Sequence, residues 1–234
     1  MMLQEFIQII GLLVISGFAL KLVANKSLFV LGWNPPGNWK YLAILLIIIT
    51  SFSAALTYLL RIVIVQEEYT FDSKLQFGQI AWSVWQNIRS VLTEELMFRG
   101  ALLYLLMQRL GTKSGLLITS ILFAGFHWMD TQLWSRPMEL LMVTCFTFLM
   151  GLVLAGAFVR TRTIWLPILI HLAWNLVQHV VFPGMPGSPS VFILAAEPPV
   201  VTISYFALFV LLFLPKIVVL AVNGWFLWRQ KPMP

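Results

Sequence analysis

Long apolar runs separated by short polar connectors make up most of the chain. An α-helix rises about 1.5 Å per residue, so about 20 apolar residues cross the hydrocarbon core of a bilayer. Seven runs reach or approach that length: 4–24, 41–64, 78–110, 115–129, 137–159, 164–182 and 199–228. The pattern predicts an all-α fold, a polytopic transmembrane helical bundle with seven spans. Pro215 is expected to kink or break the last run, so eight helices are the alternative.

The composition favours the same class of protein. Of the 234 residues, 60% are hydrophobic and 10% are charged, which is too apolar for a soluble globule. We expect one integral-membrane domain over residues 1–234. A net charge of +6 would suggest a nucleic-acid partner in a soluble protein. Here the basic residues cluster between apolar runs, so we expect contacts with membrane lipids and no nucleic acid.

The loop charges orient the predicted bundle. If the carboxyl terminus is cytoplasmic, Lys74 and Arg136 are the basic loop residues on the outer side. The cytoplasmic side then carries nine: Lys21, Lys26, Lys40, Arg109, Lys113, Arg160, Arg162, Arg229 and Lys231. The positive-inside rule therefore predicts a multi-pass protein of a bacterial-type plasma membrane with a cytoplasmic carboxyl terminus. Run 4–24 lacks a basic segment before it, which favours a retained helix over the alternative of a signal peptide.

Three formal charges lie close together in the third run, at Glu94, Glu95 and Arg99. A charged side chain in the middle of a spanning helix costs roughly 2.5 to 3.5 kcal/mol, so such a cluster suggests a functional site. Glu95 and Arg99 have the spacing of a helical ion pair, whereas Glu94 points about 100° away and ends a stripe of polar residues. We therefore assign Glu95 to neutralising Arg99 and leave Glu94 for chemistry. A buried structural ion network formed by all three is the alternative.

All three histidines of the chain also fall in apolar runs. His127 ends the fourth run, and His171 shares a helix face in the sixth run with Asn175, Gln178 and His179. Counted at 1.5 Å per residue from the cytoplasmic side, Glu94, His127, His171 and Asn175 could converge on one middle layer of the membrane, with His179 further out. A single histidine in a membrane helix more often contributes to helix packing than to catalysis. The functional interpretation therefore rests on the predicted convergence of these four residues.

These residues resemble three ordered motifs of the CPBP intramembrane proteases, the family that contains the type II CAAX prenyl endopeptidases. The motifs read Glu94-Glu95-x-x-x-Arg99, Phe123-x-x-x-His127 and His171-x-x-x-Asn175. Each motif is short, but their order and their places on apolar runs make a specific combination. The resemblance covers residues 78–182, which we expect to form the catalytic core. It implies an intramembrane endopeptidase with a peptide or protein substrate. CAAX processing is one activity that the resemblance suggests, and its substrate would carry a prenyl group.

The resemblance also implies a division of roles. Glu94 and His127 would polarise a water molecule, His171 and Asn175 would stabilise the oxyanion, and Glu95 and Arg99 would support the site or position the substrate. Peptide hydrolysis requires an activated water, a proton donor for the leaving amine and donors for the oxyanion, and these residue types can supply them.

The need for a metal is left open by the sequence. Glu94, His127 and His171 could form a zinc-type site with two histidines and one carboxylate. There is no His-Glu-x-x-His motif, and Asn175 beside His171 suits an oxyanion donor, so we favour a metal-free mechanism.

Two other classes of function remain alternatives. Buried Glu, Arg and His residues also form proton or ion relays in transporters, although no internal duplication supports a transporter here. A non-catalytic scaffold or an immunity-type relative could also retain the motifs without turnover.

Overall fold

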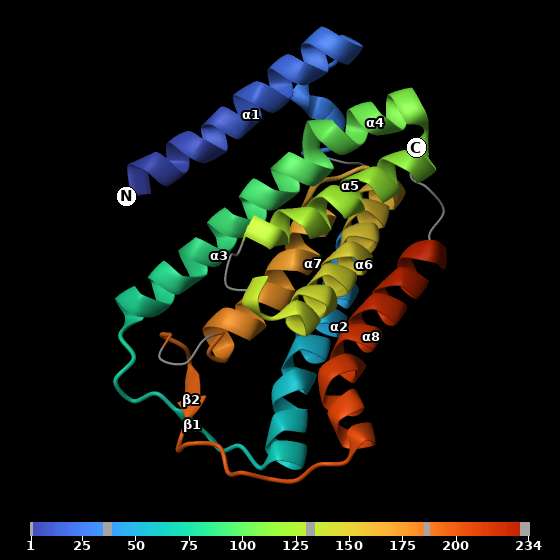
Figure 1. Cartoon of the computed structure of the whole chain (residues 1–234). Helices are drawn as coiled ribbons and strands as arrows, with labels where there is room; N and C mark the ends of the chain where they lie inside the picture. Colours follow the sequence, from blue (N-terminus) through green and yellow to red (C-terminus); the bar gives the residue numbers. More distant parts are fainter. Residues whose placement is uncertain (1, 35–38, 130–133, 185–187, 230–234) are drawn as a thin grey trace. The chain divides into compact units, whose positions relative to one another are not determined.

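A computed structural model describes residues 2–34, 39–129, 134–184 and 188–229, and almost all of its regular structure is helical (Figure 1). The helices are α1 (Met2–Ala24), α2 (Trp39–Leu60), α3 (Phe77–Met97), α4 (Leu103–Leu110), α5 (Thr112–Phe126), α6 (Pro137–Thr161), α7 (Trp165–Leu176) and α8 (Tyr205–Arg229). This confirms the predicted all-α fold. Among the described residues, four helical segments are long and apolar enough to cross a membrane: Gln4–Ala24, Trp39–Val65, Pro137–Thr161 and Tyr205–Arg229.

The third apolar run is not one straight helix. After α3 it passes through a π-helical turn, Phe98–Leu102, and continues as the short helix α4. The backbone of Gly100 leaves the helical region, with φ −77° and ψ −129°. A glycine within a wider helical turn is a common cause of a sharp bend, so the run changes direction directly after the Glu-Glu-x-x-x-Arg motif.

Other boundaries also differ from those predicted. The fourth run begins earlier, at Thr112, and ends in a short 3-10 turn, His127–Met129. The last run does not break at Pro215, which lies inside the continuous helix α8. Lys231 and part of the two connectors rich in proline and glycine lie outside the described residues.

The chain divides into two compact units. The first comprises residues 1–43, 89–169 and 224–234, and the second comprises residues 44–88 and 170–223. Because α2, α3, α7 and α8 each pass from one unit to the other, the units follow spatial packing and not segments of sequence. Each unit is described by itself below.

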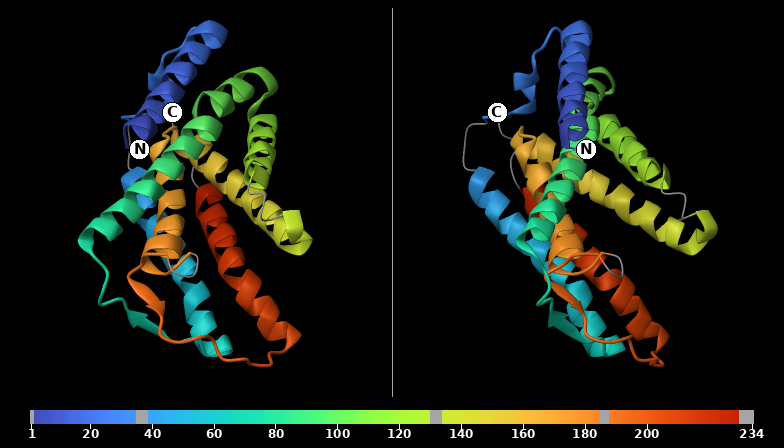
Figure 2. Two further views of the ribbon diagram at one scale, coloured as in Figure 1. Left: turned by 60° about the vertical axis from the view of Figure 1, so that its left-hand side comes forward. Right: turned by 90° about the vertical axis from the view of Figure 1, so that its left-hand side faces the viewer.

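Small residues allow the helices of the first unit to approach one another closely. α4 folds back onto α5 through a sharp turn, and α5 packs along α6 (Figure 2). A Cβ atom placed on Gly115 would lie 3.0 Å from the side chain of Met107, and one on Gly151 would lie 3.0 Å from Ser120. Close packing of helices at small residues is the usual way in which membrane helices associate.

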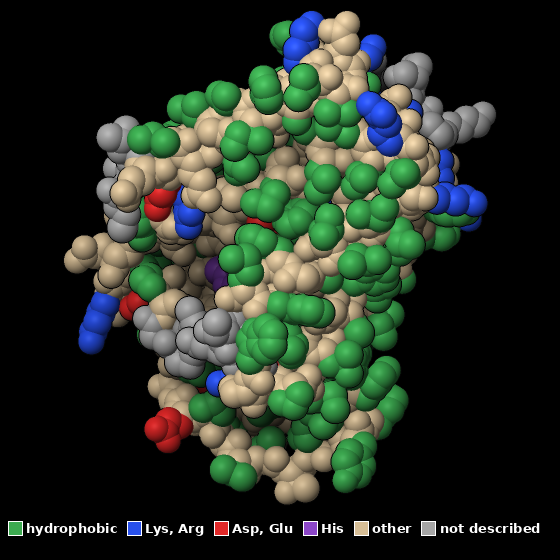
Figure 3. Space-filling model, turned by 45° about the horizontal axis from the view of Figure 1, so that its top comes forward, with side chains coloured by type: hydrophobic (Ala, Val, Ile, Leu, Met, Phe, Trp, Pro, Cys, Tyr) green, Lys and Arg blue, Asp and Glu red, His purple; other side chains and the backbone are tan. Residues whose placement is uncertain are grey.

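Basic residues mark one end of the first unit. Arg109, near the end of α4, donates a hydrogen bond of 3.2 Å to the carbonyl of Val23 at the end of α1. At the end of α6, the guanidinium of Arg160 lies 5.7 Å from the ring of Trp228. Figure 3 shows Lys and Arg side chains at several places on one face of the molecule, and hydrophobic side chains over much of the rest of it. Arg109 and Arg160 are both among the basic residues that the loop charges assign to one side of the membrane.

The second unit contains the only sheet among the described residues. Its strands β1 (Tyr69–Phe71) and β2 (Phe192–Leu194) pair antiparallel, with Thr70 opposite Ile193. Just before β1, Glu67 accepts two hydrogen bonds of 2.7 Å from Arg61 and one of 2.6 Å from the hydroxyl of Tyr69. Burial alone would raise the pKa of Glu67, but these hydrogen bonds hold it below its ordinary value. The connector after α2 is therefore fixed by an ionised carboxylate.

Glycine is required where two connectors of the first unit meet. Gly32 has a φ of +69°, and a Cβ atom there would overlap the backbone carbonyl of Arg162, which itself has a positive φ. The carbonyl of Leu31 accepts a hydrogen bond of 2.9 Å from the N–H of Ile164 at the start of α7. This contact joins the segment after α1 to the segment between α6 and α7.

We predict that Gly32→Ala lowers the free energy of unfolding by more than about 1 kcal/mol, because alanine is strained at positive φ and its methyl group has no space. Thermal unfolding in detergent, followed by tryptophan fluorescence, measures the effect. Gly156→Ala in α6 is the matched control, since a Cβ atom there meets nothing within 4 Å. An unfolding temperature of Gly32→Ala equal to that of wild type would contradict this account of the contact.

Candidate active site

The centre of the first unit is a buried ion pair on the third apolar run. Arg99 and Glu95 both have side chains with no exposed surface, and their nearest atoms are 3.1 Å apart. Arg99 also donates a hydrogen bond of 3.4 Å to the carbonyl of Gly151 on α6. Its guanidinium lies 4.0 Å from the centre of the Phe123 ring on α5. Arg99 therefore joins three helical segments. The spacing of the motif predicted its ion pair with Glu95 but not its contacts with α5 and α6.

Glu94 points in a different direction from Glu95. It accepts a hydrogen bond of 2.9 Å from the hydroxyl of Ser90, one turn earlier on α3. Glu94 is 9% exposed, whereas Glu95 is fully buried. The hydroxyl of Ser90 is therefore one partner of Glu94, and the guanidinium of Arg99 is one partner of Glu95. A carboxylate beside a water molecule can accept a proton from it.

Aromatic rings connect the ion pair with His127. Phe123 lies beneath Arg99, and its ring centre is 4.9 Å from that of His127. Phe98, the residue before Arg99, makes edge contacts with Phe123 and Phe126 at 5.4 and 5.6 Å. The end of α5 is therefore packed against the π-helical turn, and His127 lies one aromatic ring away from the guanidinium. Within the first unit, the structure brings His127 close to the segment that carries Glu95 and Arg99.

The hydrogen bonding of His127 defines which ring nitrogen is basic. Its Nδ1 lies 2.9 Å from the carbonyl oxygen of Phe123. A carbonyl can only accept, so Nδ1 carries the proton and, in the neutral ring, Nε2 has the free electron pair. This bond also fixes the orientation of the imidazole. His127 consequently presents a basic nitrogen that could take a proton from water.

The remaining predicted residues lie in the second unit. His171 and Asn175 are one turn apart on α7, and His171 is 7% exposed. The side chain of Gln178 has a structural role instead, because its amide donates hydrogen bonds to the carbonyl of Ala54 and to the hydroxyl of Thr57. His179 is exposed and lies in a π-helical turn, Val177–Val181, that ends α7. A π-helical turn is wider than an α-helical one, so Gln178 and His179 do not lie on the helix face that a regular helix would give them.

The candidate metal ligands are divided between the two units, with Glu94 and His127 in the first and His171 in the second. Among the described residues, no group of three His, Cys, Asp or Glu side chains is placed to hold one ion.

Comparison with known proteins supplies the family. Residues 76–177 match the model of the type II CAAX prenyl endopeptidase Rce1-like family. The chain carries an Rce1-like domain. The matched segment contains all three motifs, and the predicted relationship to the CAAX proteases is confirmed. Neither the curated proteins nor the solved structures gave a match.

The sequence did not reveal every residue that holds the candidate site together. Ser90 lies one turn before Glu94, and that spacing was the available signal for its hydrogen bond. The contacts of Arg99 with Phe123 and with the carbonyl of Gly151 join separate helices. No spacing along one helix could have predicted them.

We predict that Arg99→Met destabilises the protein by about 3–5 kcal/mol, because it leaves the Glu95 carboxylate buried without its counter-ion. The double variant Glu95→Leu/Arg99→Met should recover most of the loss, since it removes both charges. Thermal unfolding of the wild type, the single variant and the double variant in one detergent compares them. A double variant that is less stable than Arg99→Met would argue against a buried ion pair.

Proposed function

We propose that this protein is an intramembrane endopeptidase that hydrolyses a peptide bond with a water molecule activated by Glu94 and His127. The match to the Rce1-like family supports a membrane endopeptidase. The single observation that carries the assignment of residues is the hydrogen bond between Nδ1 of His127 and the carbonyl of Phe123, which leaves Nε2 as the basic nitrogen. A carboxylate and a correctly oriented imidazole on adjoining helical segments can share the proton transfers that hydrolysis needs.

In the proposed reaction, Glu94 and Nε2 of His127 polarise the water for attack on the peptide carbonyl. The proton that they take is then delivered to the leaving amine. His171 and Asn175 donate hydrogen bonds to the oxyanion of the tetrahedral intermediate. Glu95 acts through Arg99, by holding the bend that follows the motif, and so is a positioning residue. No serine or cysteine nucleophile is involved.

The proposed substrate is a peptide or protein that reaches the site from the membrane. The name of the matched family supports a CAAX-type peptide, with a prenyl group on its cysteine. We further propose that the basic end of the first unit faces the cytoplasm, which places the carboxyl terminus there. The apolar helices and the grouping of Arg109 and Arg160 at one end support this orientation.

We expect Glu94→Ala and His127→Ala each to lower the rate of peptide cleavage by at least about a hundredfold, because each removes a proton-transfer group. The assay uses purified protein and a fluorogenic CAAX peptide, with and without a farnesyl group. Glu139→Ala is the matched control, because that carboxylate is exposed and pairs with Arg136. Cleavage by both variants at the wild-type rate would refute the peptidase, and loss of proton flux in liposomes would then favour a transporter.

Removal of metal provides a separate test. After exhaustive chelation, the protein should keep its full rate of peptide cleavage, because the proposed steps use only side chains of the chain. The assay is repeated after zinc is added back, and thermal unfolding checks that chelation leaves the fold unchanged. A loss of activity that zinc restores would show that the mechanism requires a metal.

A further inference from the structure

A groove of about 490 Å³ lies at the end of α1, within the first unit and apart from the residues assigned to catalysis. The last turns of α1 and the 3-10 turn Leu28–Leu31 form it. Its volume falls within the range of small-molecule sites, which is about 300 to 1,000 Å³. Lys21, Asn25, Lys26 and Ser27 make up its polar wall, and Leu28 and Val30 add apolar side chains.

Backbone hydrogen bonds fix the turn that carries the polar wall. Asn25 has a φ of +52°, in the left-handed region that asparagine tolerates after a helix. Its N–H donates a hydrogen bond of 3.1 Å to the carbonyl of Lys21, and the N–H of Lys26 donates one of 3.1 Å to the carbonyl of Leu20. Arg109 donates to a third carbonyl at this helix end. These donors offset the negative partial charge of the helix terminus, which would otherwise oppose an anion.

The groove collects hydrogen-bond donors and positive charge. The ammonium of Lys21 donates a hydrogen bond of 2.7 Å to Oδ1 of Asn25, which uses one of its three N–H groups. Ser27 precedes the 3-10 turn, and its hydroxyl makes no capping hydrogen bond there. Of the lining residues that the structure describes, none is Asp or Glu. Lys21 and Lys26 therefore give the groove two positive charges without an acidic residue in its wall.

Carboxylates are also absent from the sequence around the groove. The preceding acidic residue is Glu5, which lies about 24 Å from Lys21 along the helix at 1.5 Å per residue. Glu5 pairs with Arg89 at 3.7 Å. The next acidic residue is Glu67, which belongs to the second unit. A ligand of complementary charge for the groove would therefore be an anion.

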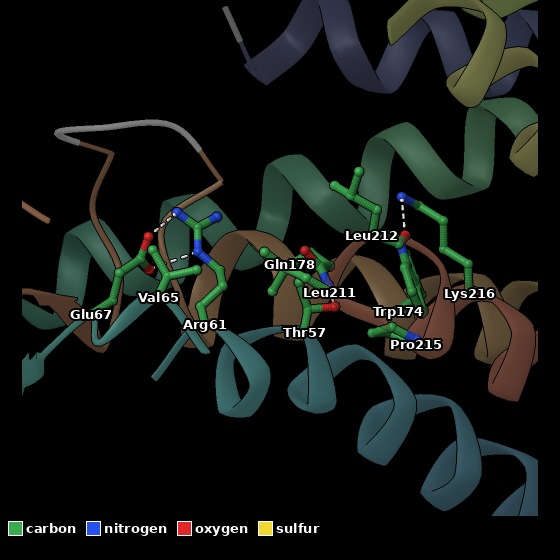
Figure 4. A pocket seen from close by; sticks show the side chains of 10 residues that line it. All are labelled: Thr57, Arg61, Val65, Glu67, Trp174, Gln178, Leu211, Leu212, Pro215 and Lys216. Atoms are coloured by element: carbon green, nitrogen blue, oxygen red, sulfur yellow. Dashed lines mark hydrogen bonds and ion pairs between the residues drawn. The ribbon is translucent and has the colours of Figure 1, made fainter. Parts of the chain in front are cut away.

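A cavity of about 340 Å³ in the second unit differs in this respect (Figure 4). At one end of it, Arg61 donates two hydrogen bonds of 2.7 Å to Glu67. At the other end, Lys216 donates one to the carbonyl of Leu212 and has further contacts. The protein itself thus engages the cations of that cavity, and the groove at the end of α1 is the better site for an anion.

The position of the groove favours the headgroup of a phospholipid. The segment Gln4–Ala24 is long and apolar enough to cross a membrane, so Lys21 in its last turn lies at the level of the headgroups. Leu22 and Phe29, which adjoin groove residues in the chain, are 72% and 81% exposed. Exposed apolar side chains beside basic ones suit the boundary between acyl chains and anionic headgroups.

We propose that this groove binds a phosphate group, with Lys21 and Lys26 contacting its oxygens and Asn25 and Ser27 donating further hydrogen bonds. Two sources share this chemistry, the headgroup of an anionic phospholipid and a soluble phosphate monoester. Hydrogen bonds from an ammonium to phosphate oxygens are stronger than those between neutral groups. The proposal does not depend on the peptidase activity, because none of the lining residues is assigned to that reaction.

Binding of radiolabelled phosphatidylglycerol to the purified protein in a non-ionic detergent tests this proposal. We expect saturable binding at a single site per chain. The double variant Lys21→Met/Lys26→Met should weaken it by about tenfold or more, which corresponds to about 1.4 kcal/mol, because both ammonium contacts are lost.

The matched control is Lys40→Met/Lys113→Met. It removes the same charge from the same predicted side of the membrane, at exposed residues that do not line the groove. Its affinity for phosphatidylglycerol should equal that of the wild type. Equal weakening in the two double variants would show a general attraction to basic residues and would overturn the proposal, as would wild-type affinity in Lys21→Met/Lys26→Met.

Competition separates the two sources of phosphate. If glycerol phosphate displaces the labelled lipid as well as unlabelled phosphatidylglycerol does, the groove recognises a phosphate without acyl chains. If only the lipid displaces it, the ligand is a phospholipid. Phosphatidylcholine, whose choline neutralises the phosphate charge, should compete poorly. Equal competition by phosphatidylcholine and phosphatidylglycerol would contradict recognition of an anion, and non-saturable binding would contradict a site.

A second variant tests the groove while both lysines remain. Ser27→Trp removes one hydroxyl donor and fills the groove at an exposed position, so it should weaken binding of phosphatidylglycerol by about tenfold or more. Thermal unfolding of each variant establishes that it is folded before binding is measured. Wild-type affinity in folded Ser27→Trp would refute the assignment of the ligand to this groove.

Discussion

The buried ion pair between Arg99 and Glu95 is the interaction on which the arrangement of the first unit depends. A guanidinium without exposed surface has to be neutralised and bonded where it lies, because its transfer from water is costly. Glu95, the carbonyl of Gly151 and the ring of Phe123 together meet this requirement. The same contacts surround the bend at Gly100, the residue after Arg99.

Local periodicity predicted the parts of this arrangement that lie on one helix. The spacing of four residues gave the Glu95–Arg99 pair, and the angle between neighbouring residues separated Glu94 from it. The apolar runs gave the all-α fold. The bend at Gly100 was missed, because a glycine inside a helical pattern is compatible with either a straight or a bent helix.

Contacts between distant segments could not be predicted in the same way. The antiparallel pairing of β1 with β2 joins residues more than a hundred positions apart, and neither strand is longer than three residues. The π-helical turn after α7 places Gln178 against α2, whereas a regular helix would align it with His171 and Asn175.

The central claim is that neighbouring carboxylates do different work, Glu94 in chemistry and Glu95 in structure. The most direct measurement compares Glu94→Gln with Glu95→Gln in one preparation, recording both the rate of peptide cleavage and the thermal unfolding temperature. Glu94→Gln should lose cleavage and unfold at the wild-type temperature, whereas Glu95→Gln should also unfold at a lower temperature. Normal cleavage by Glu94→Gln, or equal loss of stability in the two variants, would contradict it.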